Sequence, residues 1–175
     1  MSVKVDGMAE LSQNIAKLAK QKVPQAARKS INRIARQAIN GATKTVAKEV
    51  GVPTKTIRSR AKLTKKAENR SLTARINVIR SHMPAIRLLE NRSTKIWEGR
   101  GGIVVGKYAI KRGFKQKLKN GRTHLMQRQG KARYSIDVVK IPLSASLTQA
   151  FSEQLKDYQK DIRNELSKQL SEAIK

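Results

Sequence analysis

Residues 114–128 read FKQKLKNGRTHLMQR and predict a β-hairpin. The segments 114–118 and 123–128 are the two strands, and Lys119-Asn120-Gly121-Arg122 connects them. Asn-Gly is a strong hairpin signal because both positions accept a positive φ angle. The chain is therefore expected to contain an antiparallel sheet.

Further strands are expected on both sides of this hairpin. Residues 72–79 alternate in polarity, which is the strand period. The other predicted strands are 85–89, 103–110 and 134–141, with Pro142 closing the last one. Gly106 indicates a bulge in the strand at 103–110. Residues 91–102 are polar, end in Gly99-Arg100-Gly101-Gly102, and predict a long, mobile loop.

Helical spacing of apolar residues appears at both ends of the chain. It predicts helices at about 8–18, 24–50, 54–63 and 147–174, with Pro24 in a first turn and Gly51 as a C-terminal cap. The fold class is therefore α+β: N-terminal helices, an antiparallel sheet with a basic hairpin, and a C-terminal amphipathic helix. We expect one domain, in which residues 1–142 form a basic α+β body and residues 143–175 a helical extension.

The charge of the chain is strongly positive. Lys and Arg number 39 and Asp and Glu number 12, which gives a net charge of +27. Residues 141–175 hold five bases and five acids, so the whole excess lies in residues 1–140. A charge of this size attracts polyanions and repels other copies of the chain.

Several classes of protein are not indicated by the sequence. The chain has no cysteine, so neither a disulfide framework nor a thiolate metal site is expected. No apolar run approaches the ~20 residues of a membrane span. The N-terminus lacks the apolar block of a signal peptide. We expect a soluble protein made in the cytoplasm.

Candidate catalytic and ligand-binding groups are few. We interpret His82 as a turn residue and His124 as half-buried or facing a partner, because neither has acidic or histidine companions at metal-ligand spacing. Asp137 is interpreted as the acid of an ion pair with a neighbouring strand. The glycines before Ile103 lack the Lys and Ser/Thr of a phosphate loop. No enzymatic activity, cofactor or metal is expected.

Residues 53–134 carry the strongest functional signal. They contain 23 Lys or Arg against three acids, Glu68, Glu90 and Glu98. A solvated face is one interpretation, but such faces usually mix both signs, so we favour contact with nucleic acid or an acidic partner. Sequence-specific readout is not indicated, because no helix-turn-helix, zinc finger or cluster of stacking aromatics is recognisable. The candidate contact residues are Lys95, Arg100, Lys107, Lys111, Arg112, Lys115, Lys117, Lys119 and Arg122.

An acidic row is predicted on the C-terminal helix. Glu153, Asp157, Asp161 and Glu165 recur every four residues, and like charges at that spacing mildly destabilise a helix. The row is either a subunit interface that docks on the basic body of a neighbouring copy or an ordinary solvated face. Both interpretations remain open on the sequence.

Two segments carry a resemblance to a known family. The first is VPQAARKSINRIA, residues 23–35. The second is LKNGRTHLMQR at residues 118–128, followed by YSIDVVKIP at residues 134–142. These segments, in kind and in their order along the chain, resemble the minor tail protein Z family of long-tailed bacteriophages. The similarity extends from about residue 8 to residue 155.

The resemblance implies a virion component that acts in tail completion near the head-proximal end of the tail and in head-tail joining. It implies the tail terminator, tail tube and head-tail connector proteins as partners, and it carries no catalytic residues. Our first hypothesis is a tail-completion protein that forms or joins a homo-oligomeric ring, with basic loops facing genomic DNA or an acidic tube surface. The alternative is a non-specific nucleic-acid-binding protein acting alone.

Overall fold

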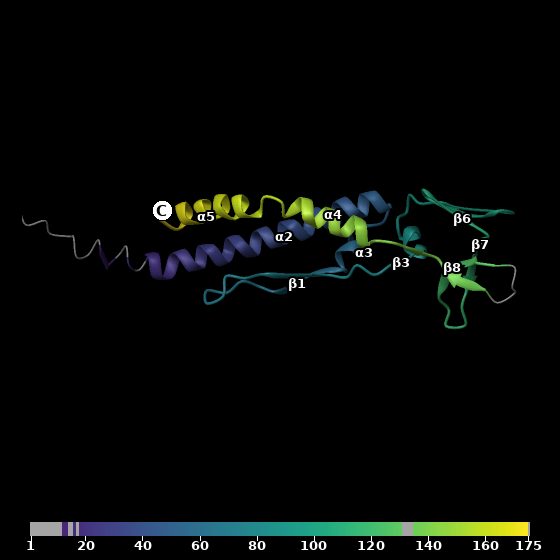
Figure 1. Cartoon of the computed structure of the whole chain (residues 1–175), viewed down its shortest axis with the longest axis horizontal. Helices are drawn as coiled ribbons and strands as arrows, with labels where there is room; N and C mark the ends of the chain where they lie inside the picture. The colour runs from purple at the N-terminus through teal and green to yellow at the C-terminus, as the bar shows by residue number, and fades with distance from the viewer. Residues whose placement is uncertain (1–11, 14–15, 17, 131–134, 175) are drawn as a thin grey trace, which may run out of the picture. The chain divides into compact units, whose positions relative to one another are not determined.

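In the computed structural model (Figure 1), residues 12–13, 16, 18–130 and 135–174 are described. Most of the predicted helix at 8–18 lies outside them. The contacts of the chain form two compact units. The first comprises Met1–Ala38, Leu63–Asn77 and Gln154–Lys175, and the second comprises Ile39–Lys62 and Val78–Glu153. The division into a body of 1–142 and an extension of 143–175 stays a prediction.

The elements confirm the α+β class. The helical elements are a π-helical turn η1 (Leu18–Lys22), α2 (Val23–Val50), α3 (Thr54–Arg58), a 3-10 helix η2 (Ala85–Glu90), α4 (Ser144–Gln154) and α5 (Tyr158–Ile174). The strands are β1 (Ala61–Lys65), β2 (Arg75–Val78), β3 (Met83–Pro84), β4 (Ile96–Gly99), β5 (Gly102–Val105), β6 (Tyr108–Lys111), β7 (Gly113–Lys117), β8 (Thr123–Arg128), β9 (Ile136–Val138) and β10 (Lys140–Ile141). They form the sheets β1-β2, β10-β3, β4-β5-β6 and β7-β8-β9.

Helix α2 begins and ends as the sequence predicts. Pro24 is its second residue and lies directly after η1, and proline has no amide hydrogen to donate there. Gly51 has φ +83° and donates its amide to the Ala47 carbonyl over 2.9 Å, which caps the C-terminus. The buried hydroxyls of Ser30 and Thr43 donate to the carbonyls four residues earlier, at 2.9 and 2.7 Å. Burial of these polar groups therefore leaves no donor unsatisfied.

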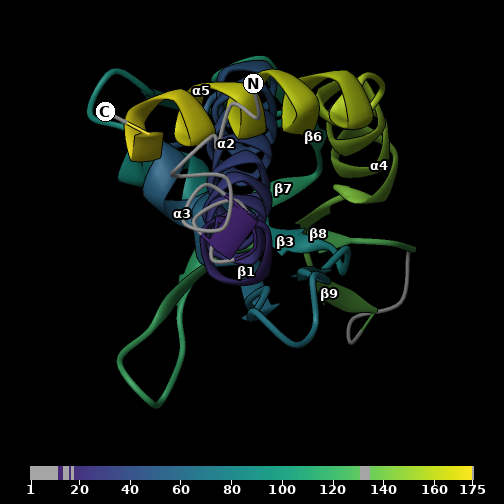
Figure 2. The ribbon, with the colours of Figure 1, turned by 90° about the vertical axis from the view of Figure 1, so that its left-hand side faces the viewer.

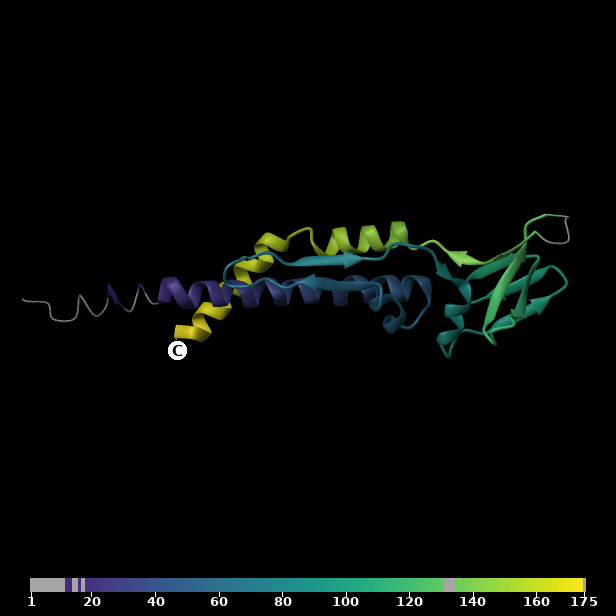
Figure 3. The same cartoon turned by 90° about the horizontal axis from the view of Figure 1, so that it is seen from below.

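In the first unit, the early part of α2 lies between α5 and the hairpin of residues 63–77 (Figures 1, 2 and 3). The Asn32 side chain fixes the hairpin: its Nδ2 donates to the Ala67 carbonyl over 3.0 Å, and its Oδ1 accepts from the Ala67 amide over 2.9 Å. On the α5 side, the Arg33 guanidinium donates to the Glu165 carboxylate over 2.9 Å. Residues far apart in the sequence are thus joined through polar side chains of α2.

The core of the second unit has helical and strand contributions. The later part of α2 and α4 supply Ala42, Val46, Leu147 and Ala150, all buried, and η2 and the strands supply Met83, Leu88, Ile103, Val105, Leu125 and Ile141. The sheets are tied together by the backbone, since the Val139 amide donates to the Leu125 carbonyl and the Ala85 amide to the Val139 carbonyl. This core supports the strands that carry the candidate basic residues.

The hairpin expected from Asn120-Gly121 is present. Strands β7 and β8 pair from Gly113↔Gln127 to Lys117↔Thr123, and Gly121 has φ +75° in the connecting turn. The strand expected at 103–110 is wrong as one element: β5 and β6 form a second hairpin instead. Gly106, with φ +57°, lies in its turn rather than in a bulge. A glycine between two strand-forming segments is also a turn signal, because glycine accepts a positive φ.

Three other expectations need correction. Residues 85–89 are not a strand but lie in η2, where Ala85 and Leu88, three residues apart, are the buried positions. The helix expected at 54–63 ends at Arg58, and β1 follows with an alternating pattern that starts at the buried Ala61. The loop expected at 91–102 contains β4, which pairs with β5. Short apolar runs fit helix and strand equally well, so tertiary packing decides between them.

Candidate functional site: basic strands and a cationic pocket

The nine candidate basic residues all lie in the second unit, from the residue before β4 to the end of the β7–β8 turn. Lys95 precedes β4, Arg100 lies in the β4–β5 turn and Lys107 in the β5–β6 turn. Lys111 ends β6, Arg112 follows it, and the other four occupy β7 and its turn: Lys115, Lys117, Lys119 and Arg122. Every one of these nine residues is exposed. The nine residues together are called the basic strand region below.

The side chains of two members of the basic strand region form hydrogen bonds with backbone carbonyls of the protein. Arg112 has φ +56°, its amide donates to the Gly101 carbonyl over 2.9 Å, and its guanidinium donates to the Gly130 carbonyl over 2.7 Å. The Lys107 ammonium donates to the Glu49 carbonyl and lies 5.5 Å from the centre of the Tyr108 ring. These two cations therefore also hold local structure. Lys115 and Lys117, two apart on β7, point to one side of the strand and remain exposed.

The positive charge of this region is not neutralised within the described part of the chain. There, the ion pairs within 4.0 Å are Arg33–Glu165 and Arg87–Glu90, and neither includes a member of the basic strand region. Exposed cations without acidic neighbours attract an anionic surface from solution. The geometry is thus suited to a non-specific electrostatic contact.

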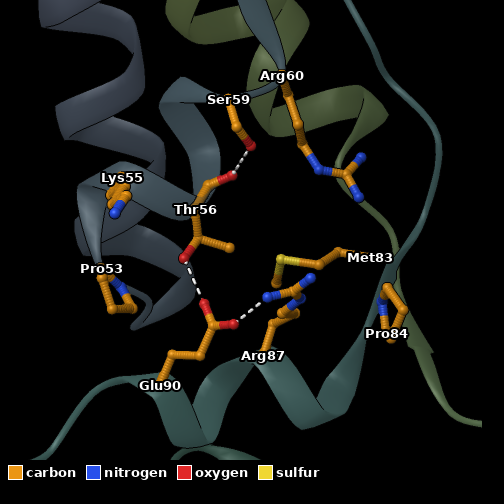
Figure 4. Close-up of a pocket in the computed structure, with 9 residues that line it drawn as sticks. All are labelled: Pro53, Lys55, Thr56, Ser59, Arg60, Met83, Pro84, Arg87 and Glu90. Carbon is orange, nitrogen blue, oxygen red and sulfur yellow. Dashed lines mark hydrogen bonds and ion pairs between the residues drawn. The ribbon is translucent and has the colours of Figure 1, made fainter. Parts of the chain in front are cut away.

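Sequence reasoning missed a cationic pocket in the same unit (Figure 4). The cavity, of about 680 Å³, lies between α3, the segment after it, and η2. Its charged lining is Lys55, Arg60, Arg87 and Glu90, three cations to one anion. In Figure 4 the Arg60 and Arg87 guanidinium groups both point into the space beside Met83. The sequence contains one indication of this pocket: Glu90 is the single acid between residues 69 and 97.

Hydrogen bonds and an ion pair fix the positions of the Arg60, Arg87 and Glu90 side chains in this pocket. Arg60 donates to the Ser81 carbonyl over 2.6 Å and to the His82 carbonyl over 3.3 Å. Burial, and then the positive charge of Arg87, lower the pKa of Arg60. Glu90 accepts from the Thr56 hydroxyl over 2.7 Å and pairs with Arg87. The guanidinium groups of Arg60 and Arg87 therefore make the pocket suited to binding an anionic group from solution.

The predicted acidic row is not continuous. Glu153 lies on α4, Asp157 in the turn at residues 155–157, and Asp161 and Glu165 on α5. The expectation of one helix from 147 to 174 is therefore wrong. Asp157 directly precedes α5 and Asp161 lies in its first turn, where acidic residues are favoured by the free amides of a helix N-terminus. Glu165 is engaged by Arg33 of its own chain.

The remaining candidates have structural surroundings. His124 is half-buried on β8, as predicted, and its Nδ1 is buried without a hydrogen-bond partner. His82 is exposed and accepts through its carbonyl from Arg60. Asp137 is exposed opposite Gln127, and no ion pair joins it to another described residue, so the expected salt bridge stays a prediction.

The described residues lack two further kinds of feature. No group of three or more His, Cys, Asp or Glu side chains there is placed to hold a metal ion. None of the helices in that part of the chain is both long and apolar enough to cross a membrane.

Comparison with known proteins places the chain in a family. The chain is 36% identical to the "Tail completion protein" of Escherichia phage N15 over 161 residues, which cover 89% of this chain and 86% of the relative. It is also 36% identical to "Tail completion protein Z" of Escherichia phage lambda, with 97% and 94% of the two chains covered. No solved structure matches. The family model described as "Prophage minor tail protein Z (GPZ)" matches residues 5–175, and the chain therefore belongs to this family of minor tail proteins.

Proposed function

We propose that this protein is a structural component of a bacteriophage tail and acts in tail completion. The observation that carries the proposal is the family match over residues 5–175, together with two relatives that are named tail completion proteins. The role is non-enzymatic: the protein completes an assembly through its surfaces and carries out no chemical step. Its site of action is the head-proximal end of the tail, where it prepares the tail for joining to the head.

The charge distribution supports contact with anionic partners at the head-proximal end of the tail. The excess of +27 opposes self-association unless other molecules neutralise it. We propose a homo-oligomeric ring in which the tail terminator, tail tube or connector proteins, or the genomic DNA, supply the opposite charge. The nine residues of the basic strand region are the contact surface.

A second candidate function is non-specific nucleic-acid binding by the isolated protein. The observation in its favour is the absence of ion-pair partners for the basic strand region among the described residues. The two functions differ in what the isolated chain does: a protein that works alone binds DNA before assembly, whereas a tail component needs its neighbours.

Inactivation of the gene in the phage, with complementation by the wild-type protein, tests the proposed function. Without the protein, infectious particles should fall by orders of magnitude while heads and tail tubes still form, and negative-stain images should show tails that fail to join heads. Complementation should restore joined particles. Normal joining and normal infectivity without the protein would refute the proposal.

A further inference from the structure

The outward face of the β4–β5–β6 sheet carries an apolar row. The register places Trp97 opposite Val104 and Val104 opposite Ala109, so the three side chains cross the sheet side by side. Trp97 is 66% exposed and Val104 is 41% exposed, and Ala109 is exposed as well. The alternate residues Ile103, Val105 and Ile110 are buried in the core. The row is thus the unburied side of a sheet whose other side is already packed.

Space next to the row is open. A shallow depression of about 330 Å³ is lined by residues that include Trp97, Val104, Ala109, Lys111, Gly99 and Gly102. A Cβ added at Gly99 would meet no atom within 4 Å. An exposed aromatic residue beside a β-branched neighbour and an open depression is typical of a binding hot spot rather than of a solvated strand.

The charge around the row indicates what covers it. Residues 95–112 contain five bases, Lys95, Arg100, Lys107, Lys111 and Arg112, and one acid, Glu98. A second copy docked face to face would bring these bases against their equivalents, and like charges across an interface oppose association. A partner with an apolar patch and an acidic rim would satisfy both the row and its surroundings.

We propose that the Trp97–Val104–Ala109 row is a docking face for a different tail protein that presents an apolar patch rimmed by Asp and Glu. The assignment of the partner to the tail rests on the proposed function. The docking face itself rests on the register, the exposure and the charge. Trp97 supplies the desolvated centre of the contact, and Lys95, Arg100 and Lys111 supply its electrostatic rim.

Trp97 is also the single tryptophan of the chain, so its fluorescence reports on this face alone. The protein is labelled by replacing its tryptophan with 5-hydroxytryptophan, which can be excited selectively in the presence of other proteins. The labelled full chain is mixed with tails purified from infections that lack this gene, and co-sedimentation, emission wavelength and acrylamide quenching are measured. The emission should shift to shorter wavelength and quenching should fall as the chain binds.

Variants separate the docking face from general effects. Trp97→Ala should weaken co-sedimentation on the order of tenfold or more, while Trp97→Phe retains most of it. Leu72→Ala removes another exposed apolar side chain, 46% exposed, and should bind as the wild type does. Binding should also weaken as salt is raised, because the rim is charged.

Every other result overturns the proposal in an identifiable way. If the wild-type chain does not bind the tails, the proposed function fails together with the docking face. If it binds with Trp97 as accessible as before, or if Trp97→Ala binds equally well, the docking face alone fails. The same emission shift on concentrating the pure protein would assign the face to a second copy. The same shift with a single-stranded oligonucleotide would assign it to base stacking.

Discussion

The Arg33 guanidinium and the Glu165 carboxylate form an ion pair at 2.9 Å, between residues 132 positions apart in the sequence. The Glu165 side chain is 12% exposed and that of Arg33 is 48% exposed. The Glu165 carboxylate also accepts a hydrogen bond from the Gln169 side-chain Nε2 over 3.1 Å. One member of the acidic row therefore joins α5 to α2 within the chain, which gives it a structural role that Glu153, Asp157 and Asp161 do not share.

Breaking this pair should cost modest stability. Because Arg33 is half exposed, water and salt screen the interaction, and Arg33→Met and Glu165→Gln should each lower the free energy of unfolding by about 0.2–1 kcal/mol. Urea denaturation of both single variants and the double variant measures the coupling between them. Glu153→Gln is the control and should leave stability unchanged. Strictly additive effects of the two substitutions would show that the pair contributes nothing.

Gly102 should be intolerant of a side chain. It has φ +140°, and an added Cβ would lie 2.1 Å from the Ile110 carbonyl oxygen and 2.8 Å from the Arg112 amide nitrogen. Gly102→Ala should therefore lower stability by about 1–3 kcal/mol through backbone strain and loss of the β5–β6 pairing. Gly101→Ala is the matched control, because a Cβ there meets nothing within 4 Å. Thermal unfolding of the two variants measures the difference, and equal melting temperatures would contradict the strain.

The ionisation of Glu90 in the cationic pocket should make the stability of the fold depend on pH. Burial alone would raise the pKa of Glu90, but hydrogen bonds from Thr56 and Arg87 and the positive charges of Arg87 and Lys55 outweigh it, so the pKa lies below its ordinary value of 4.5. Ionised Glu90 therefore stabilises the fold above pH 4.5, and this contribution is lost as the pH falls through the lowered pKa. The stability advantage of the wild type over Glu90→Gln should shrink in acid. Urea denaturation at neutral pH and below pH 4.5 measures it, and a constant difference would contradict the assignment.

Any binding of DNA should depend on the lysines of the basic strand region and on salt. Replacing Lys111, Lys115, Lys117 and Lys119 by Gln removes four exposed charges. For each phosphate that is no longer neutralised, the slope of log affinity against log salt should become shallower by about 0.9. The control replaces four other exposed lysines, Lys44, Lys48, Lys65 and Lys66, so that the net charge is the same. Titration of duplex DNA at several salt concentrations measures both; equal slopes would assign the binding to net charge alone.

Infectivity of phage carrying the same two four-lysine variants distinguishes function from solubility. The variant of the basic strand region should form fewer infectious particles than the wild type, and the control variant should not. Circular dichroism of both proteins checks that the fold is retained. Equal infectivity would show that the charge of the basic strand region only solvates the surface.

The sequence predicted those features that depend on local chemistry. Asn120-Gly121 located a hairpin turn, and Pro24 and Gly51 lie at the start and just past the end of α2, because positive φ angles and helix ends require particular residue types. Gly106 was recognised as irregular but assigned to a bulge, since a two-residue turn and a bulge both use glycine.

Features that depend on long-range packing were not predictable. The stripe from Leu147 to Ile174 continues in the sequence through residues 155–157, where the helix is interrupted, and it contains no Gly or Pro at that point. Phe151 before the break is buried, whereas Tyr158 after it is 45% exposed. The pocket of Arg60, Arg87 and Glu90 combines segments about 30 residues apart, so its charges could be counted but not placed.

The central claim, action at the head-proximal end of the tail, is tested most directly by a cryo-electron microscopy difference map. Tails purified from infections with and without this protein are compared along their whole length. The account predicts additional density, in ring-like symmetry, confined to the head-proximal end of tails that contain the protein. Density along the tube or at the distal tip, or identical maps from the two preparations, would contradict it.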